Sequence, residues 1–134
     1  MDNNFLIKFE NNLSISETLY ERIMKIIKIK DMTMEDFYSE TDLNRNILSD
    51  IKKNKSRPQL RTVITICIGL GLEPNESYEL VRLAGYVLTS TIYLDYAYIE
   101  LLNCYYEFGI AECNKRLKEL GVDEKHYLGS QTRK

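Results

Sequence analysis

The chain has 134 residues, 44% of them hydrophobic and 28% charged, and its 18 Lys and Arg against 20 Asp and Glu leave a net charge of −2. These values are typical of a soluble globular protein with one domain, or with a small domain and an extension. Membrane and secreted proteins are excluded because no apolar stretch approaches roughly 20 residues and the polar start is not a secretory signal, so we expect a cytoplasmic location.

The first part of the chain is expected to be an arm followed by a helix. Residues 1–13 form the arm, in which the alternation of apolar and other side chains from Phe5 to Phe9 also allows one short strand. Ser14 and Glu17 form a capping-box pair, which predicts a helix that begins at Ser14. The apolar stripe of this helix consists of Ile15, Leu19, Ile23, Ile26 and Ile27.

Four more short helices are expected to complete a compact domain. Thr33 caps "MEDFYSET", "DLN" turns the chain, and Asn44 caps a helix over residues 45–54. "KNKSRP" is a loop, and its Pro58 suits the first turn of the next helix, "QLRTVITICIGLGL". "ESYELVRLAGY" is the fifth helix. Residues 14–86 are therefore predicted to form an all-α domain of five helices.

After this domain, two more helices and a tail are predicted. The segment "TIYLDYAYIELLNCYYEF" begins at Ser90 or Thr91 and is apolar nearly all round. A last helix, "IAECNKRLKEL", ends before Gly121. We interpret residues 87–121 as a helical extension for dimerisation or partner binding, and residues 122–134 as a tail.

Few side chains are available for metal binding or catalysis. The three cysteines, Cys67, Cys104 and Cys113, form no CxxC pair, and His126 is the single histidine. A zinc site needs four such ligands at close spacing, and the sequence contains no GxxxxGK[ST], GxGxxG or HExxH motif. We therefore expect reduced, partly buried thiols, no metal, no cofactor and no enzymatic activity.

An ordered set of motifs runs from Thr33 into the fourth helix. Thr33 is followed four residues later by Phe37, then by the pair "LN", the helix core "LSDI", the basic loop "KNKSRPQL" and the apolar helix "TVITICIGLGL". This order and spacing resemble the helix-turn-helix domain of the Cro and phage-repressor-like (XRE) regulators. The resemblance covers residues 14 to about 86 and implies a five-helix repressor-like fold that binds double-stranded DNA.

The resemblance also implies which residues contact DNA. In this family the helix over residues 45–54 enters the major groove, and Arg45, Asn46 and Asp50 occupy positions that touch base edges. Phosphate contacts are expected from Thr33, Asn44, Lys52, Lys53, Lys55, Arg57 and Arg61. Residues 44–61 carry a net charge of +5, which leaves −7 for the rest of the chain, and such an uneven distribution can orient a duplex.

Three positions depart from the family pattern. Tyr38 replaces a small Ala, so its ring is expected either to shift the packing of the motif helices or to point outward. Asp42 replaces the glycine of the turn, and Asp tolerates a left-handed backbone better than most residues. Met34 replaces a glutamine that often bonds the DNA backbone, and Met has no side-chain donor.

Six of the ten tyrosines lie between Tyr86 and Tyr106. Tyrosine suits interfaces because it combines a large apolar ring with a hydroxyl group. We predict a homodimer or partner interface formed by Tyr93, Tyr96, Tyr98, Leu102, Tyr105 and Tyr106. An ordinary intramolecular core is the alternative interpretation of the same residues.

Two functions fit these observations. The first is a dimeric transcriptional regulator that binds operator DNA in a bacterium, a prophage or a mobile element, and a repressor is the expected type. The second uses the same scaffold for protein binding, as in an antitoxin-like protein, a phage-encoded inhibitor or an adaptor. The second is favoured by the acidic first helix of the motif, by Met34, by Tyr38 and by the tyrosine-rich helix.

Overall fold

The computed structural model describes residues 3–5, 17–54 and 56–130. Over these residues the protein is all-α, without a strand, and the predicted fold class is confirmed. The predicted arm lies largely outside the described ranges. The elements are α2 (Leu19–Ile29), α3 (Met34–Thr41), α4 (Ile47–Lys53), α5 (Leu60–Gly69), α6 (Pro74–Leu83), α7 (Tyr93–Cys104), α8 (Gly109–Glu119) and the 3-10 helix η1 (Glu124–His126).

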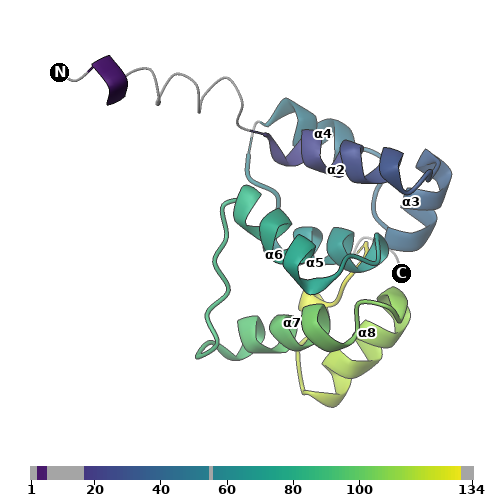
Figure 1. The fold of residues 1–134 in the computed structure, drawn as a ribbon. Helices are drawn as coiled ribbons and strands as arrows, with labels where there is room; N and C mark the ends of the chain where they lie inside the picture. Colours follow the sequence, from purple (N-terminus) through teal and green to yellow (C-terminus); the bar gives the residue numbers. More distant parts are fainter. Residues whose placement is uncertain (1–2, 6–16, 55, 131–134) are drawn as a thin grey trace.

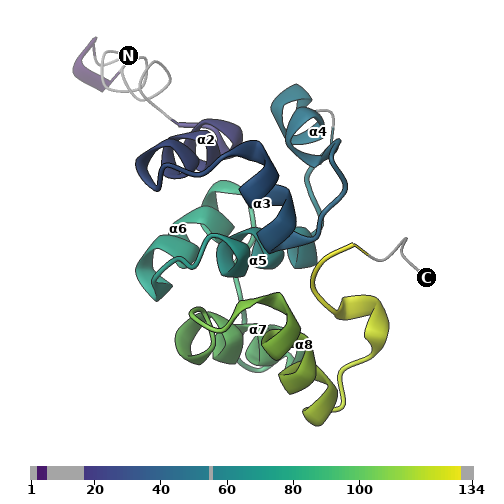
Figure 2. The ribbon, with the colours of Figure 1, turned by 90° about the vertical axis from the view of Figure 1, so that its right-hand side faces the viewer.

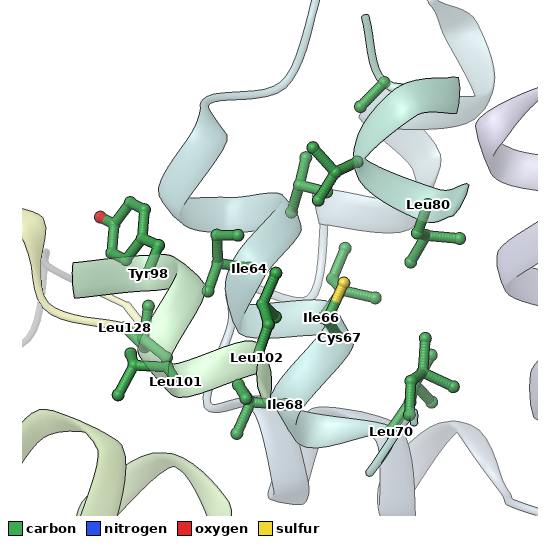
Figure 3. Packing of buried hydrophobic residues seen from close by; sticks show 14 of the residues in the cluster. Ile64, Ile66, Cys67, Ile68, Leu70, Leu80, Tyr98, Leu101, Leu102 and Leu128 are labelled. Carbon is green, nitrogen blue, oxygen red and sulfur yellow. The ribbon is translucent and has the colours of Figure 1, made fainter. Parts of the chain in front are cut away.

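Helix α5 lies in the middle of the molecule, between α2 to α4 on one side and α7 and α8 on the other (Figure 1). It packs against α3, α6, α7 and α8. Every side chain from Thr62 to Ile68 is buried, as expected for a helix that is apolar nearly all round. Tyr98 and Leu102 of α7 lie beside α5 in the core (Figure 3). The extension after α6 therefore shares one hydrophobic core with the five-helix part.

The N-terminus of α2 differs from the prediction. The capping box is formed by Thr18 and Glu21, whose side chains each accept a hydrogen bond from the other's backbone N–H at 3.0 and 2.9 Å. The helix therefore begins at Leu19, and the predicted cap Ser14 lies outside the described residues. Glu17, the other half of the predicted pair, instead accepts a hydrogen bond from Arg22 at 2.8 Å. The sequence contains two S/T-x-x-E patterns four residues apart, and the helix uses the second.

Helices α3 and α5 approach each other closely at Thr41 and Gly69. Thr41 is fully buried at the end of α3, and its hydroxyl donates to the carbonyl oxygen of Phe37 at 2.8 Å. A Cβ atom added at Gly69 would lie 2.4 Å from Cγ2 of Thr41. Only glycine leaves room for this crossing, which holds the first helix of the predicted DNA-binding motif against the core.

The chain after α8 is not a free tail as far as it is described. Val122 and Leu128 are buried in the core cluster, with 9% and 4% of their surfaces exposed. The Asn114 side chain accepts a hydrogen bond from the Leu128 N–H at 2.7 Å and donates one to the Leu128 carbonyl at 3.0 Å. The prediction of a tail over residues 122–134 is therefore corrected for its first nine residues, because a mostly polar sequence with isolated apolar residues gives no sign of this packing.

Residues 127–130, here called the C-terminal strap, follow η1 and run past α5 to the turn that follows α3 (Figure 2). The backbone N–H of Gly129 donates to the hydroxyl of Thr65 at 3.1 Å. The N–H of Ser130 donates to the carbonyl oxygen of Asp42 at 2.6 Å. The strap thus joins α5 to the turn of the predicted DNA-binding motif.

Candidate nucleic-acid interface

The turn between α3 and α4 has the backbone that a helix-turn-helix requires. Asp42, which replaces the family's glycine, has φ 54° and ψ 36°, the left-handed conformation expected of it. The carbonyl group of the Asn44 side chain accepts from the Asn46 N–H at 2.8 Å, which stabilises one turn of chain ahead of α4. Helix α4 therefore begins at Ile47, two residues later than predicted, and Arg45 lies in the turn before it.

Helix α4 presents one face to the core and the other to solvent. Leu48 and Ile51 are buried, as predicted. Arg45, Asn46 and Asp50, the three predicted base-reading residues, are exposed at the start of this element. Arg45 and Asn46 lie in the turn just before α4, Asp50 lies in its first turn, and we call these three exposed residues the recognition surface. It adjoins a groove whose lining includes Asp50, Lys53, Arg57, Gln59 and Arg61.

The Arg45 side chain has a defined partner on α3. Its Nη2 atom donates to both carboxylate oxygens of Glu35, with a distance of 3.1 Å to Oε2. The two side chains are 66% and 69% exposed, so the pair is open to a ligand. The guanidinium carbon also lies 5.4 Å from the centroid of the Tyr38 ring, within the range of a cation–π contact.

Tyr38 contacts the turn as well as Arg45. Its hydroxyl donates to the Arg45 carbonyl oxygen at 3.0 Å, and its half-buried ring meets Phe37 edge-on at 5.0 Å between centroids. The ring is therefore neither displaced into the core nor free in solvent, and it bridges α3 and the turn. The sequence does not predict the contacts of Glu35 and Tyr38 with Arg45, because they join residues ten and seven positions apart in two different elements. The ten-residue separation of Glu35 and Arg45 across a helix-turn-helix was the available signal.

The predicted phosphate-binding residues fall into different surroundings. Lys52 lies 5.6 Å from the Tyr20 ring centroid, and Lys53 is exposed at the end of α4. The Thr33 side chain caps α3 by accepting from the Asp36 N–H at 2.9 Å. The predicted contact Lys55 lies outside the described residues. Lys52 is thus directed toward α2, and Lys53 is exposed at the end of α4.

The two predicted arginines beyond α4 make contacts within the protein. Arg57 donates to the Gly85 carbonyl at 2.7 Å and stacks over the Tyr86 ring at 4.4 Å, although the residue remains exposed. Arg61 donates from Nη1 to the Gly129 carbonyl at 2.6 Å. Partial burial lowers the pKa of Arg61. Its predicted phosphate role is therefore in conflict with a structural role in holding the C-terminal strap.

The predicted interface on α7 is only partly at the surface. Tyr98 and Leu102 are 1% and 0% exposed and belong to the intramolecular core, which corrects their assignment to a dimer interface. Tyr105 and Tyr106 are half-buried. Tyr93 and Tyr96 remain exposed near the start of α7. A helix that is apolar all round could not show from its period which residues face its own domain.

The cysteines are free thiols in distinct surroundings. Cys67 and Cys113 are buried, and burial raises the pKa of each thiol to about 12. Cys104 is exposed at the end of α7, unlike the expected partly buried state.

Within the described ranges, no cluster of His, Cys, Asp or Glu side chains could hold a metal ion. Among the described helices, none is long and apolar enough to cross a membrane.

Comparison with known proteins identifies the part of the chain that carries this geometry. Residues 22–82 match the family model of the Cro/C1-type HTH DNA-binding domain. Neither the curated proteins nor the solved structures gave a significant match. The matched range runs from α2 to α6 and includes α3, the turn and α4, while α7, α8 and the C-terminal strap follow it. Residues 22–82 of this chain are therefore a Cro/C1-type helix-turn-helix DNA-binding domain of the XRE family.

Proposed function

We propose that the protein is a sequence-specific transcriptional regulator that binds operator DNA as a dimer. The observation that carries this proposal is the recognition surface, because Arg45, Asn46 and Asp50 are exposed together at the start of α4. In a helix-turn-helix, this end of the second motif helix lies in the major groove. Arg pairs with guanine, Asn with adenine, and Asp accepts from cytosine.

Phosphate contacts fix the register of such a protein on DNA. Lys52 and Lys53 are exposed at the end of α4, and Arg57 is exposed after it, so three positive charges follow the recognition surface along the chain. The cation–π contacts of Lys52 and Arg57 hold these side chains without neutralising them. We assign the phosphate contacts to these three residues, and to Lys55 from the sequence alone, and we assign Arg61 to the strap.

Dimerisation is proposed through the exposed apolar residues around the start of α7. Val87, Ile92, Tyr93 and Tyr96, here called the α7 patch, are each more than half exposed, with Val87 at 85%. Large apolar side chains left exposed along one segment of the chain favour a protein–protein contact. Two-fold dimers are the commonest assemblies and suit operators with two half-sites about one helical turn apart.

Binding to DNA is tested with fluorescently labelled, mixed-sequence duplexes in a salt series. If phosphates are contacted as proposed, the logarithm of the binding constant should fall linearly with the logarithm of salt concentration. A selection from a random duplex library should then yield a defined site with two related halves. Absence of binding at low salt, with the protein folded by circular dichroism, would refute the proposal.

A second function is favoured by the acids of α3. Glu35, Asp36 and Glu40 are exposed on α3, the first helix of the motif. Glu35 also pairs with Arg45 of the recognition surface. An acidic surface repels phosphates and suits a basic protein partner. A protein-binding module, such as an inhibitor or an adaptor, would bind no DNA in the salt series and would retain the same fold.

A further inference from the structure

We propose that Glu35 is a specificity-determining positioning residue, which holds the Arg45 side chain ready to bind guanine. This inference rests on the proposed function. It adds a residue, Glu35, that does not itself touch a base and acts through Arg45. Glu35 is in the first turn of α3, Arg45 is in the turn ahead of α4, and the ion pair connects the two. Neither α4 nor the core supplies this contact.

The pair leaves the donors that a guanine needs. An arginine side chain has five N–H donors. Within the described part of the chain, the hydrogen bonds of the Arg45 side chain come only from Nη2 and go to Glu35. The three N–H groups on Nε and Nη1 remain for a ligand. Guanine, which offers O6 and N7 as acceptors, can take one hydrogen bond from Nε or Nη1 while Glu35 stays on Nη2, and a two-bond contact also uses the second N–H of Nη2.

The backbone of Arg45 is held from the same helix. The Tyr38 hydroxyl donates to the Arg45 carbonyl at 3.0 Å, and the Tyr38 ring lies under the guanidinium group at 5.4 Å. Backbone and side chain are thus both restrained before DNA arrives. A restrained arginine loses less conformational freedom on binding than a mobile one, which favours the correct base.

The charge of Glu35 has the opposite effect on phosphates. Its carboxylate is exposed next to the recognition surface and repels a nucleic acid backbone of any sequence. Positioning and repulsion therefore predict effects of opposite sign when the charge is removed. Sequence discrimination should fall at one base pair, while affinity for arbitrary DNA should stay the same or rise.

The test is a selection from a random-sequence duplex library with the wild-type chain, Glu35→Gln, Arg45→Ala and a matched control, Glu40→Gln. Glu40 is an exposed acid on the same helix. Its replacement by glutamine removes one negative charge, as Glu35→Gln does, without changing the ion pair with Arg45. We expect the wild-type chain to prefer guanine at one position of each half-site, and Arg45→Ala to abolish that preference. Glu35→Gln should reduce it on the order of 10-fold and leave the other positions unchanged. Glu40→Gln should preserve it.

Affinity for mixed-sequence duplexes is measured in parallel and should not decrease in either glutamine variant. A Glu35→Gln protein that keeps the full guanine preference would overturn the inference, as would one whose preference becomes stronger, since Glu35 would then compete with DNA for Arg45. Loss of preference at every position, in a Glu35→Gln chain that is folded by circular dichroism, would also overturn it, because Glu35 would then support the whole recognition surface and not Arg45 alone. If Arg45→Ala selects the same site as the wild-type chain, the base-reading role of Arg45 in the proposed function fails instead, and the inference fails with it.

Discussion

The guanidinium group of Arg61 donates a 2.6 Å hydrogen bond to the carbonyl oxygen of Gly129, and so joins the start of α5 to the C-terminal strap. Gly129 in turn donates to the hydroxyl of Thr65, one helical turn further along α5. The strap is therefore bound to α5 by both a charged side chain and a backbone contact. Since Ser130 also donates to the Asp42 carbonyl, this part of the chain supports the turn that precedes the recognition surface.

Replacing Arg61 is therefore expected to affect stability. Arg61→Ala should lower the free energy of unfolding by about 1–3 kcal/mol, because it removes a charged donor from a buried strap carbonyl. Urea denaturation measures this change. Arg82→Ala, which removes an exposed arginine paired with Glu79 on α6, is the control and should change stability little. An unchanged unfolding midpoint in Arg61→Ala would show that the strap does not depend on this bond.

Replacing Lys53 is expected to weaken DNA binding and to leave the stability of the fold unchanged. Lys53 is exposed at the end of α4. Lys53→Ala should reduce the slope of DNA affinity against salt by about one and weaken all sequences alike, because it removes one phosphate contact. Its stability should stay within about 0.5 kcal/mol of the wild-type value. Lys118→Ala on α8 should leave the slope unchanged, and an equal loss in both variants would argue against a local contact.

The sequence predicts the helix-turn-helix well because its signals are local. Thr33 caps α3 as predicted, in a capping box with Asp36, and Asp42 adopts the predicted left-handed conformation. Leu48 and Ile51 point to the core because their spacing suits one face of a helix. Each of these features depends on residues a few positions apart, for which propensity and spacing are informative.

The contacts that the sequence does not predict join residues far apart in the chain. Arg61 is bound by Gly129, and Tyr98 donates to the His126 carbonyl at 2.8 Å. A charged side chain in a basic segment is consistent with both phosphate binding and an internal bond. Likewise, a tyrosine on an apolar helix is consistent with both an interface and a core. Only the packing of α7 and α8 on α5 decides between these roles.

The α7 patch gives a prediction for assembly. Tyr96 is 56% exposed, and a charge placed there should oppose burial against a second copy. Tyr96→Glu should raise the dimer dissociation constant by about 10-fold or more, as expected when a central aromatic residue is lost. Sedimentation velocity over a range of concentrations measures the change. As a control, Ile29→Glu alters another exposed apolar residue, at the end of α2, and should leave the dimer intact. A wild-type chain that is monomeric at all concentrations would rule out dimerisation.

The crossing of α3 and α5 gives a prediction that two variants test together. Gly69→Ala should destabilise the fold by about 1–3 kcal/mol, since its methyl group would overlap Cγ2 of Thr41. Thr41→Ser removes that methyl group and keeps a hydroxyl for the bond to Phe37. The double variant should therefore recover most of the stability that Gly69→Ala loses, and urea unfolding of all four chains measures the coupling. Additive losses would show that the overlap is not the cause.

The buried thiols give a prediction for alkaline pH. Burial raises the pKa of Cys67 and Cys113 to about 12 in the folded chain, above the ordinary thiol value of about 8.5. The unfolded chain therefore loses these protons first, so the stabilisation is complete below about pH 8.5 and is lost as pH rises through about 12. Between pH 8 and pH 10 we expect the free energy of unfolding to fall by about 2–4 kcal/mol.

Cys67→Ala should remove about half of that decrease, whatever its effect on stability at pH 8, because one of the two buried thiols no longer titrates. Urea unfolding at both pH values measures the difference. A thiol reagent at pH 8 provides an independent measurement: it should modify Cys104 in the folded chain at once, and Cys67 and Cys113 only as fast as the protein unfolds. Rapid modification of all three cysteines would show that α5 and α8 open far more readily than their burial implies.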